Sequence, residues 1–330
     1  RSALPARSEM CIRDSTKRFG KRTAVDNLTF TVEPGHITGF LGPNGAGKST
    51  TMRMIVELET PNAGFALIDG MRYRDLNNPL CTVGALLNTN CMHPRRSGRN
   101  HLRYMAASND IPMNRVEECL ALVGLTEVAS QPTKSYSLGM RQRLGMAEAM
   151  LGNPRYLLFD EPVNGLDPEG IAWFRRFAKN LAAEGRGILV SSHLLAEISQ
   201  TADRLVVLGQ GKLLANTSIA EFEKQAPTRV RARTKFAPQL VRILAEAGLS
   251  AAVDPTDTSS DSSLGTAVIV DADNTSVVAD LAAKNNIPLY ELVVIGASVE
   301  DVYLQMTQDW EQYRSGGTSL TTNGNGQEAK

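Results

Sequence analysis

The chain has 330 residues, of which 42% are hydrophobic, and its 35 lysine and arginine residues are balanced by 35 aspartate and glutamate residues. This length is compatible with two domains, and the zero net charge argues against a dedicated nucleic-acid binder, which usually carries a basic excess. No apolar stretch approaches the roughly 18–20 residues needed to cross a bilayer, and the first residues lack the apolar core of a secretory signal. We therefore expect a cytoplasmic, soluble protein that reaches a membrane only by docking on a partner.

Most of the chain, residues 10–225, alternates short apolar runs with helical patterns. Residues 1–9 before it are expected to be a flexible leader. Strands are expected within 11–33 and at 37–41, 65–68, 83–87, 156–159, 187–191 and 204–208. Helices are expected at 48–58, 98–108, 114–123, 139–151, 168–184 and 194–201. This alternation predicts an α/β fold with a mainly parallel sheet covered by helices.

A change of pattern follows the break at Gln225-Ala226-Pro227. Strands at 228–234, 249–253, 266–271 and 287–294, with helices at 238–247 and 275–284, give a βαββαβ order that predicts a small ferredoxin-like α+β domain over 228–310. Its first strand alternates Arg229, Arg231 and Arg233, and we expect this basic row to be a solvated sheet face. A last helix is expected at 298–308, and the polar tail 311–330 is expected to be disordered.

A glycine-rich loop follows the strand at 37–41. Its residues fit the pattern G-x-x-x-x-G-K-[ST] in full: Gly42, Pro43, Asn44, Gly45, Ala46, Gly47, Lys48, Ser49 and Thr50. The glycines let successive backbone N–H groups point at phosphate oxygens, and the following helix adds the positive end of its dipole. Lys48 supplies a charge to the outer phosphates, and the Ser49 hydroxyl is a suitable Mg²⁺ ligand.

Two carboxylates, Asp160 and Glu161, end the apolar strand at 156–159. In an open α/β sheet this end of the strand lies where ligands bind. Asp160 is expected to hold Mg²⁺, mostly through water, and Glu161 to orient or deprotonate an attacking water. Phosphoryl transfer requires mainly positioning and charge neutralisation, so these groups and the loop predict a nucleoside triphosphatase.

Taken together, these motifs and their order resemble the P-loop ATP-binding cassette of ABC transporters, closest to the exporter-type group that includes antibiotic- and bacteriocin-resistance transporters. The resemblance covers residues 10–225, with 89–150 as the helical subdomain. Residues 136–143 stand where the family has its signature, residues 164–167 resemble the D-loop, and Ser191-Ser192-His193 resembles the switch histidine. Phe19 stands where the family stacks an aromatic ring on adenine.

The resemblance implies that two cassettes, expected to be two copies of this chain, bind head to tail and enclose ATP and Mg²⁺. Ser137 and Gly139 would offer a hydroxyl and N–H groups to the γ-phosphate held by the other cassette. His193 would contact the γ-phosphate and hold Glu161, and Asp167 would lie at the dimer seam. Lys48, Glu161 and His193 are thus the expected catalytic residues, and a separate membrane permease, on the inner face of the cell membrane, is the expected partner.

Two positions depart from the family pattern. Leu138 and Met140 replace a glycine and the glutamine of the signature. Asn88 stands where a strand of the family ends in the Q-loop glutamine, which contacts Mg²⁺ and the water; it is either that contact, shortened by one methylene, or an ordinary loop residue. These departures keep open a module that binds ATP without turning it over. A soluble ABC ATPase acting on ribosomes or DNA is the other alternative, disfavoured because the chain has one cassette and no long coiled-coil insertion.

Overall fold

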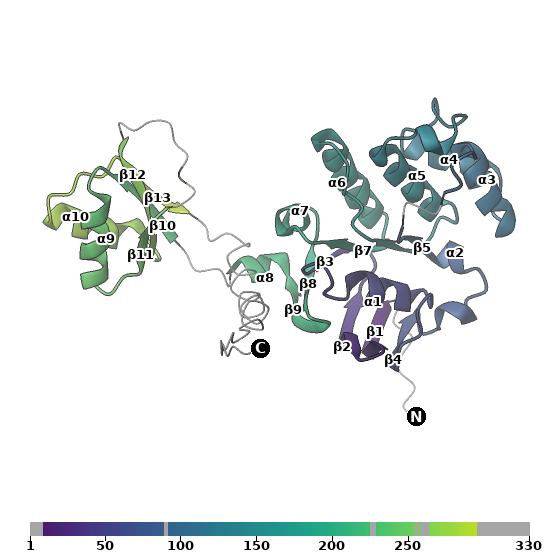
Figure 1. The fold of residues 1–330 in the computed structure, drawn as a ribbon, viewed down its shortest axis with the longest axis horizontal. Helices are drawn as coiled ribbons and strands as arrows, with labels where there is room; N and C mark the ends of the chain where they lie inside the picture. Colours follow the sequence, from purple (N-terminus) through teal and green to yellow (C-terminus); the bar gives the residue numbers. More distant parts are fainter. Residues whose placement is uncertain (1–8, 89–91, 225–228, 255–256, 258–263, 296–330) are drawn as a thin grey trace, which may run out of the picture. The chain divides into compact units, whose positions relative to one another are not determined.

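The computed structural model describes residues 9–88, 92–224, 229–254, 257 and 264–295 (Figure 1). The chain divides into two compact units, Arg1–Ile219 and Ala220–Lys330, so the division precedes the predicted break. The predicted leader up to residue 8, the break at 225–227, the last helix at 298–308 and the tail at 311–330 lie outside the described residues.

The larger sheet of the first unit has six strands in the order β5-β6-β7-β3-β8-β9. Their bounds are Val83–Leu86 (β5), Tyr156–Phe159 (β6), Gly187–Ser192 (β7), Ile37–Leu41 (β3), Arg204–Gly209 (β8) and Lys212–Ser218 (β9). Every residue of β3, β6 and β7 is buried, as expected for strands covered on both faces. All neighbouring strands are parallel except β8 and β9. The predicted mainly parallel sheet is confirmed, and β9 adds an antiparallel edge that the sequence pattern does not predict.

A second, antiparallel sheet of the same unit has the order β2-β1-β4. Its strands are Arg22–Val32 (β2), Met10–Phe19 (β1) and Ala63–Ile68 (β4), and the helix α1 spans Lys48–Ile55. The core joins α1 to both sheets, because Met52 and Ile55 are buried with Phe30 of β2 and Phe40 of β3. The rings of Phe30 and Phe40 lie 5.1 Å apart. Burial of each such side chain contributes about 1.5–3 kcal/mol, which holds the start of α1 against the end of β3.

On the opposite face of the large sheet from α1 lie α6 (Pro168–Ala183) and α7 (Leu195–Ser199) (Figure 1). Asp167 caps α6, since its side chain accepts a hydrogen bond from Gly170 N–H, and Pro168 occupies the first helical position, where no N–H is needed. Shorter segments are α2 (Pro79–Thr82), α8 (Ile219–Lys224) and the 3₁₀ turns Tyr73–Asp75 and Thr133–Ser135. In the described part of the chain, no helix combines the length and apolar character needed to cross a bilayer.

Three helices form the helical part between β5 and β6: α3 (Gly98–Ser108), α4 (Asn114–Leu122) and α5 (Leu138–Met150). They contact one another, and α5 also contacts β5. Ser97 and Ser137 cap α3 and α5 through their side-chain oxygens. The buried His101 of α3 contacts Glu148 of α5 at 2.9 Å. The helical patterns predicted for this region are confirmed to within about one residue, and α5 is therefore fixed to the sheet and to its neighbouring helices.

The second unit has four antiparallel strands in the order β11-β12-β10-β13. Its elements are β10 (Arg229–Thr234), α9 (Ala237–Glu246), β11 (Ala251–Val253), β12 (Thr266–Asp271), α10 (Thr275–Lys284) and β13 (Glu291–Ile295). Leu240 and Leu244 of α9 and Val278 of α10 are buried with Val230 and Val268 of the sheet. The predicted βαββαβ order is observed, with both helices on one face of the sheet.

The arginine row on the other face of β10 is not a solvated row. Arg229 pairs with Asp271 and Arg231 with Glu291. Arg233 is only 4% exposed and pairs with Asp257 and Glu291. The expectation of a solvated face is wrong at Arg233, because carboxylates from other parts of the chain converge on its guanidinium.

Candidate functional site: a phosphate loop facing two strand-end carboxylates

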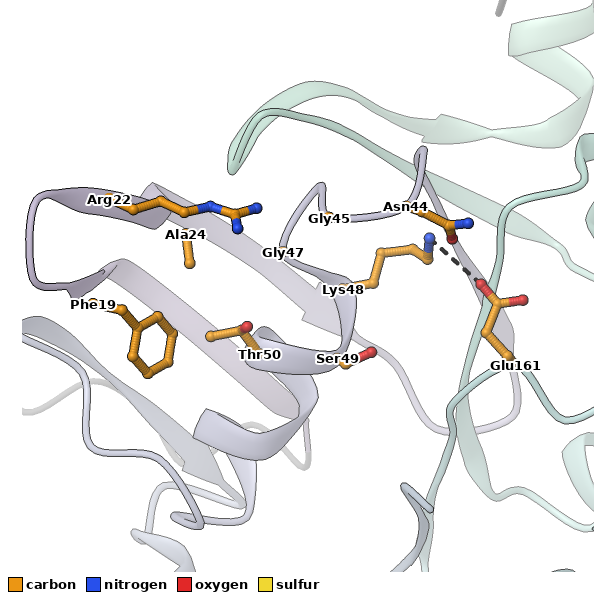
Figure 2. A pocket seen from close by; sticks show the side chains of 10 residues that line it. All are labelled: Phe19, Arg22, Ala24, Asn44, Gly45, Gly47, Lys48, Ser49, Thr50 and Glu161. Atoms are coloured by element: carbon orange, nitrogen blue, oxygen red, sulfur yellow. Dashed lines mark ion pairs between the residues drawn. The ribbon is translucent and has the colours of Figure 1, made fainter. Parts of the chain in front are cut away.

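The loop between β3 and α1 borders a cavity of about 410 Å³ (Figure 2). Gly45 and Gly47 have φ angles of 83° and 106°, in the region that favours glycine. A side chain on Gly47 would also meet the carbonyl oxygen of Ala24 at 2.5 Å. The loop therefore needs glycine for its curl. The residues that line the cavity are Phe19, Arg22, Ala24, Asn44, Gly45, Gly47, Lys48, Ser49, Thr50 and Glu161.

Lys48 is the first residue of α1 and is only 6% exposed. Its Nζ donates to the carbonyl oxygens of Gly42 at 2.5 Å and Pro43 at 3.4 Å. It also forms an ion pair with Glu161 Oε1 at 3.4 Å (Figure 2). A buried ammonium beside an open cavity provides a binding charge for an anion, and the start of α1 adds its dipole.

Glu161 is the second residue after β6, and its backbone has φ 48°, a conformation that non-glycine residues rarely adopt. Its N–H donates to the Ser191 hydroxyl at 2.8 Å. On the carboxylate, Oε2 lies 2.9 Å from His193 Nδ1 and accepts from Asn164 Nδ2 at 3.4 Å. The predicted catalytic residues Lys48, Glu161 and His193 are thus brought together, and the carboxylate faces the phosphate loop.

Asp160 and Ser49 are the predicted metal ligands of this site. The Ser191 hydroxyl donates to Asp160 Oδ1 at 2.6 Å, and Ser49 lines the cavity at the start of α1. The described residues contain no cluster of three or more His, Cys, Asp or Glu side chains. This sparse set of hard oxygen donors fits Mg²⁺, which typically takes one or two protein ligands and completes its shell with water and substrate phosphates.

Phe19 and Asn88, two other predicted site residues, lie at the ends of β1 and β5. Phe19 is 48% exposed and lines the cavity, with Lys17 Nζ 4.9 Å from its ring centre. Asn88 is exposed and follows Leu86, whose carbonyl accepts from Asp160 N–H at 2.8 Å. This places Asn88 at the same edge of the sheet as Asp160, although it does not line the cavity. The two interpretations of Asn88 remain open.

Comparisons with known proteins identify the family. The family model described as ABC transporter matches residues 25–164. YhcH of Bacillus subtilis (strain 168), named as an uncharacterized ABC transporter ATP-binding protein, is 33% identical over 304 residues, which cover 91% of this chain and 96% of that protein. The chain belongs to the family of ABC transporter ATP-binding proteins. It is accordingly an ABC ATPase.

A further relative and a solved structure are consistent with membership of this family. BcrA of Enterococcus faecalis, named as a bacitracin transport ATP-binding protein, is 38% identical over 213 residues, which cover 64% of this chain and 69% of that protein. A solved structure titled as the ATP binding subunit of an ABC transporter has a TM-score of 0.60 at 27% identity and covers 66% of this chain and 92% of its own. The predicted resemblance and the ABC cassette fold are therefore confirmed.

The residues expected to form the signature and the D-loop do not line the cavity of this ABC ATPase. Ser137 caps α5 by accepting from Met140 N–H at 3.1 Å, and Asp167 caps α6. Gly139 lies beside Leu166, which a side chain at that glycine would meet at 3.2 Å. Within one chain, these residues therefore lie outside the set that borders the phosphate loop.

Sequence reasoning missed several residues of the site. Arg22 and Ala24 of β2 line the cavity, and Ser191 bridges Asp160 and Glu161 from the neighbouring strand β7. Asn164 and Gln142 contact Glu161 from the following turn and from α5. The resemblance had placed Gln142, Asn164 and Ser191 inside matched segments without giving these three residues a role. Ser191 carried a further signal, a hydroxyl at the carboxyl end of an apolar strand, because parallel neighbours end at the same edge of a sheet.

Proposed function

We propose that this ABC ATPase hydrolyses ATP bound with Mg²⁺ to drive export through a separate membrane permease. The observation that carries the proposal is the placement of Glu161, whose carboxylate contacts Lys48 and His193 at the edge of the phosphate-loop cavity. A carboxylate held at this point is suited to orient and deprotonate a water that attacks the γ-phosphate.

Each residue of the site has a proposed role. The loop N–H groups of residues 42–50 and Lys48 bind the phosphates, and Phe19 stacks on the adenine. Ser49 and Asp160 hold Mg²⁺, with Asn88 as a further contact, and the metal supplies charge neutralisation on the phosphate oxygens. Glu161 accepts the proton of the attacking water, and His193 keeps the carboxylate in place through its 2.9 Å contact.

We further propose that a second copy of this chain completes the site. Ser137 and the N–H groups near Gly139 begin α5 and do not line the cavity of their own chain. A head-to-tail pair would bring them to the γ-phosphate bound by the other copy, with Asp167 at the seam. Leu138 and Met140 leave the Ser137 hydroxyl and the helix start unchanged, which favours turnover over mere binding.

The relatives and the proposed domain layout support the transport role. BcrA is named for bacitracin transport, and this supports a resistance-type exporter for the present chain. In the proposed layout, residues 10–225 are the cassette, the helical part within 89–150 docks on the permease at the inner face of the membrane, and 228–310 form an accessory domain. The balanced net charge gives no support for binding to nucleic acid.

The test is the Glu161→Gln variant, with Glu169→Gln, an exposed glutamate in the first turn of α6, as the matched control. Glu161→Gln is expected to lower steady-state ATP hydrolysis by about 100-fold or more, because the proton acceptor is lost, and to accumulate an ATP-bound dimer by size-exclusion chromatography. Unchanged hydrolysis would remove Glu161 from its role.

The same variant tests the partner. With ATP, it is expected to recover a protein with several membrane spans from detergent-solubilised native membranes, identified by mass spectrometry. Recovery of only ribosomal or DNA-associated proteins would replace the exporter by a soluble machine.

A further inference from the structure

The side-chain amide of Gln142 connects α5 to the turn that carries Glu161. Gln142 lies in the second turn of α5 and is only 6% exposed. Its Nε2 donates to two backbone carbonyl oxygens, those of Glu161 at 3.4 Å and Asn164 at 3.2 Å. The glutamine therefore contacts the main chain of the turn, while the Glu161 carboxylate points to Lys48 and His193.

The backbone of Glu161 needs such support, because its φ of 48° is a strained conformation for a residue with a side chain. The peptide is held on both sides. Its N–H donates to the Ser191 hydroxyl at 2.8 Å, and its carbonyl accepts from Gln142 and from Asn164 N–H at 3.2 Å. Loss of one of these contacts would let the peptide relax and move the carboxylate.

The amide oxygen of Gln142 indicates that glutamine is not the most stabilising residue at this position. Its Oε1 is buried and has no hydrogen-bond donor among the described residues of the protein. A buried polar atom without a protein partner is costly, and an apolar side chain of similar volume would avoid that cost. The donor Nε2 is thus the part of the side chain that the site uses.

The start of α5 and the turn that carries Glu161 also contact each other through apolar packing. A side chain on Gly165 would meet Leu138 Cδ2 at 2.1 Å, so the first residue of α5 lies directly on the turn. Gly139 likewise lies beside Leu166. The start of α5 and the turn 161–166 therefore pack directly against each other, and Gln142 adds a polar contact between them.

We propose that Gln142 is a positioning residue for ATP hydrolysis, which holds the strained main chain of Glu161 so that its carboxylate faces the γ-phosphate. The inference rests on the proposed role of Glu161 as the hydrolytic carboxylate. Gln142 touches neither the cavity nor the carboxylate, so its effect falls on turnover and leaves ATP binding unchanged.

The first test is Gln142→Met in the full chain, with the exposed Gln131→Met as the matched control. Methionine keeps the length but removes the donor, so kcat for ATP is expected to fall about tenfold, since small displacements of a reacting group have large effects on rate. KM for ATP should stay within about twofold of wild type, and the melting temperature should not fall. Unchanged kcat, or a fall in kcat accompanied by a lower melting temperature, would overturn the proposal.

A second variant, Gln142→Glu, separates positioning from packing by its pH dependence. The ionised side chain of this variant has no donor for the two carbonyl oxygens that Gln142 contacts. The protonated side chain can donate its O–H to one of them. The ratio of its kcat to that of wild type is expected to rise as the pH is lowered from about 8.5 to about 6, because these surroundings favour the neutral acid. A ratio that does not change with pH would contradict the proposal.

Failure of this inference can be told apart from failure of the proposed function. If wild type and Gln131→Met hydrolyse ATP and Glu161→Gln does not, the proposed function stands whatever the Gln142 variants do. If Glu161→Gln hydrolyses ATP at the wild-type rate, the proposed function fails, and with it the role of Gln142.

Discussion

Among the described residues, each unit buries one lysine or arginine side chain, and the two side chains are held in different ways. Lys48 is 6% exposed and Arg233 is 4% exposed. Arg233 donates twice to the Asp257 carboxylate at 2.9 Å and once to Glu291 at 3.2 Å. Lys48 contacts two carbonyl oxygens and, at 3.4 Å, the carboxylate of Glu161. That carboxylate also contacts His193.

Under the proposed function, the difference separates a structural charge from a charge that binds phosphate. The carboxylates around Arg233 satisfy its charge, and hydrogen bonds from Arg231 and Arg233 lower the pKa of Glu291. Lys48 also has partners within the chain, but a cavity of about 410 Å³ opens beside it. A buried charge is costly unless it is paired, and under the proposed function a phosphate in this cavity would be a further partner for Lys48.

The largest expected effect is on Lys48. Lys48→Ala should weaken ATP binding about 10- to 100-fold, because a hydrogen-bonded charge contact is worth about 1.5–3 kcal/mol. Titration of the purified chain with a fluorescent ATP analogue measures the loss. Lys212→Ala, at an exposed ion pair with Asp26, is the control. Full-strength binding by Lys48→Ala would place the phosphates elsewhere.

The counterpart in the second unit is Arg233→Met. Methionine removes the guanidinium that pairs with both Asp257 and Glu291, and breaking a buried pair in this way is strongly destabilising. The melting transition of the second unit should fall by at least about 5 °C, while ATP binding stays at the wild-type level. Arg242→Met, at an exposed pair with Glu246, should shift neither. A loss of ATP binding in Arg233→Met would contradict the division into a structural and a binding cation.

The smallest expected effect is on Arg22, a second cation beside the phosphate loop. It lines the cavity from β2 and extends toward Gly45 (Figure 2). Arg22→Ala should weaken ATP binding about two- to fivefold, as expected for an exposed charge contact, with a smaller effect on AMP because fewer phosphates are present. Arg18→Ala, on the same hairpin, is the control. Equal losses for ATP and AMP would assign Arg22 to the nucleoside instead of the phosphates.

Local sequence determined the parts of this protein whose chemistry lies in consecutive residues. The loop 42–50 requires glycines and one lysine in a fixed order, and its curl needs only its own backbone. The alternation of apolar runs and helical patterns likewise predicted most strands and helices, because burial of one face is a local property of the pattern. The carboxylates Asp160 and Glu161 were predictable because they end an apolar strand.

Only the tertiary structure decided which distant residues meet at these groups. Ser191 reaches Asp160 across 31 positions of the chain because β6 and β7 are parallel neighbours. Gln142 meets Glu161 across 19 positions because α5 packs beside the turn. Glu291 lies 58 positions from Arg233. Hydrogen bonds and ion pairs of this kind depend on distances of a few ångströms between elements, and sheet order and helix packing set those distances.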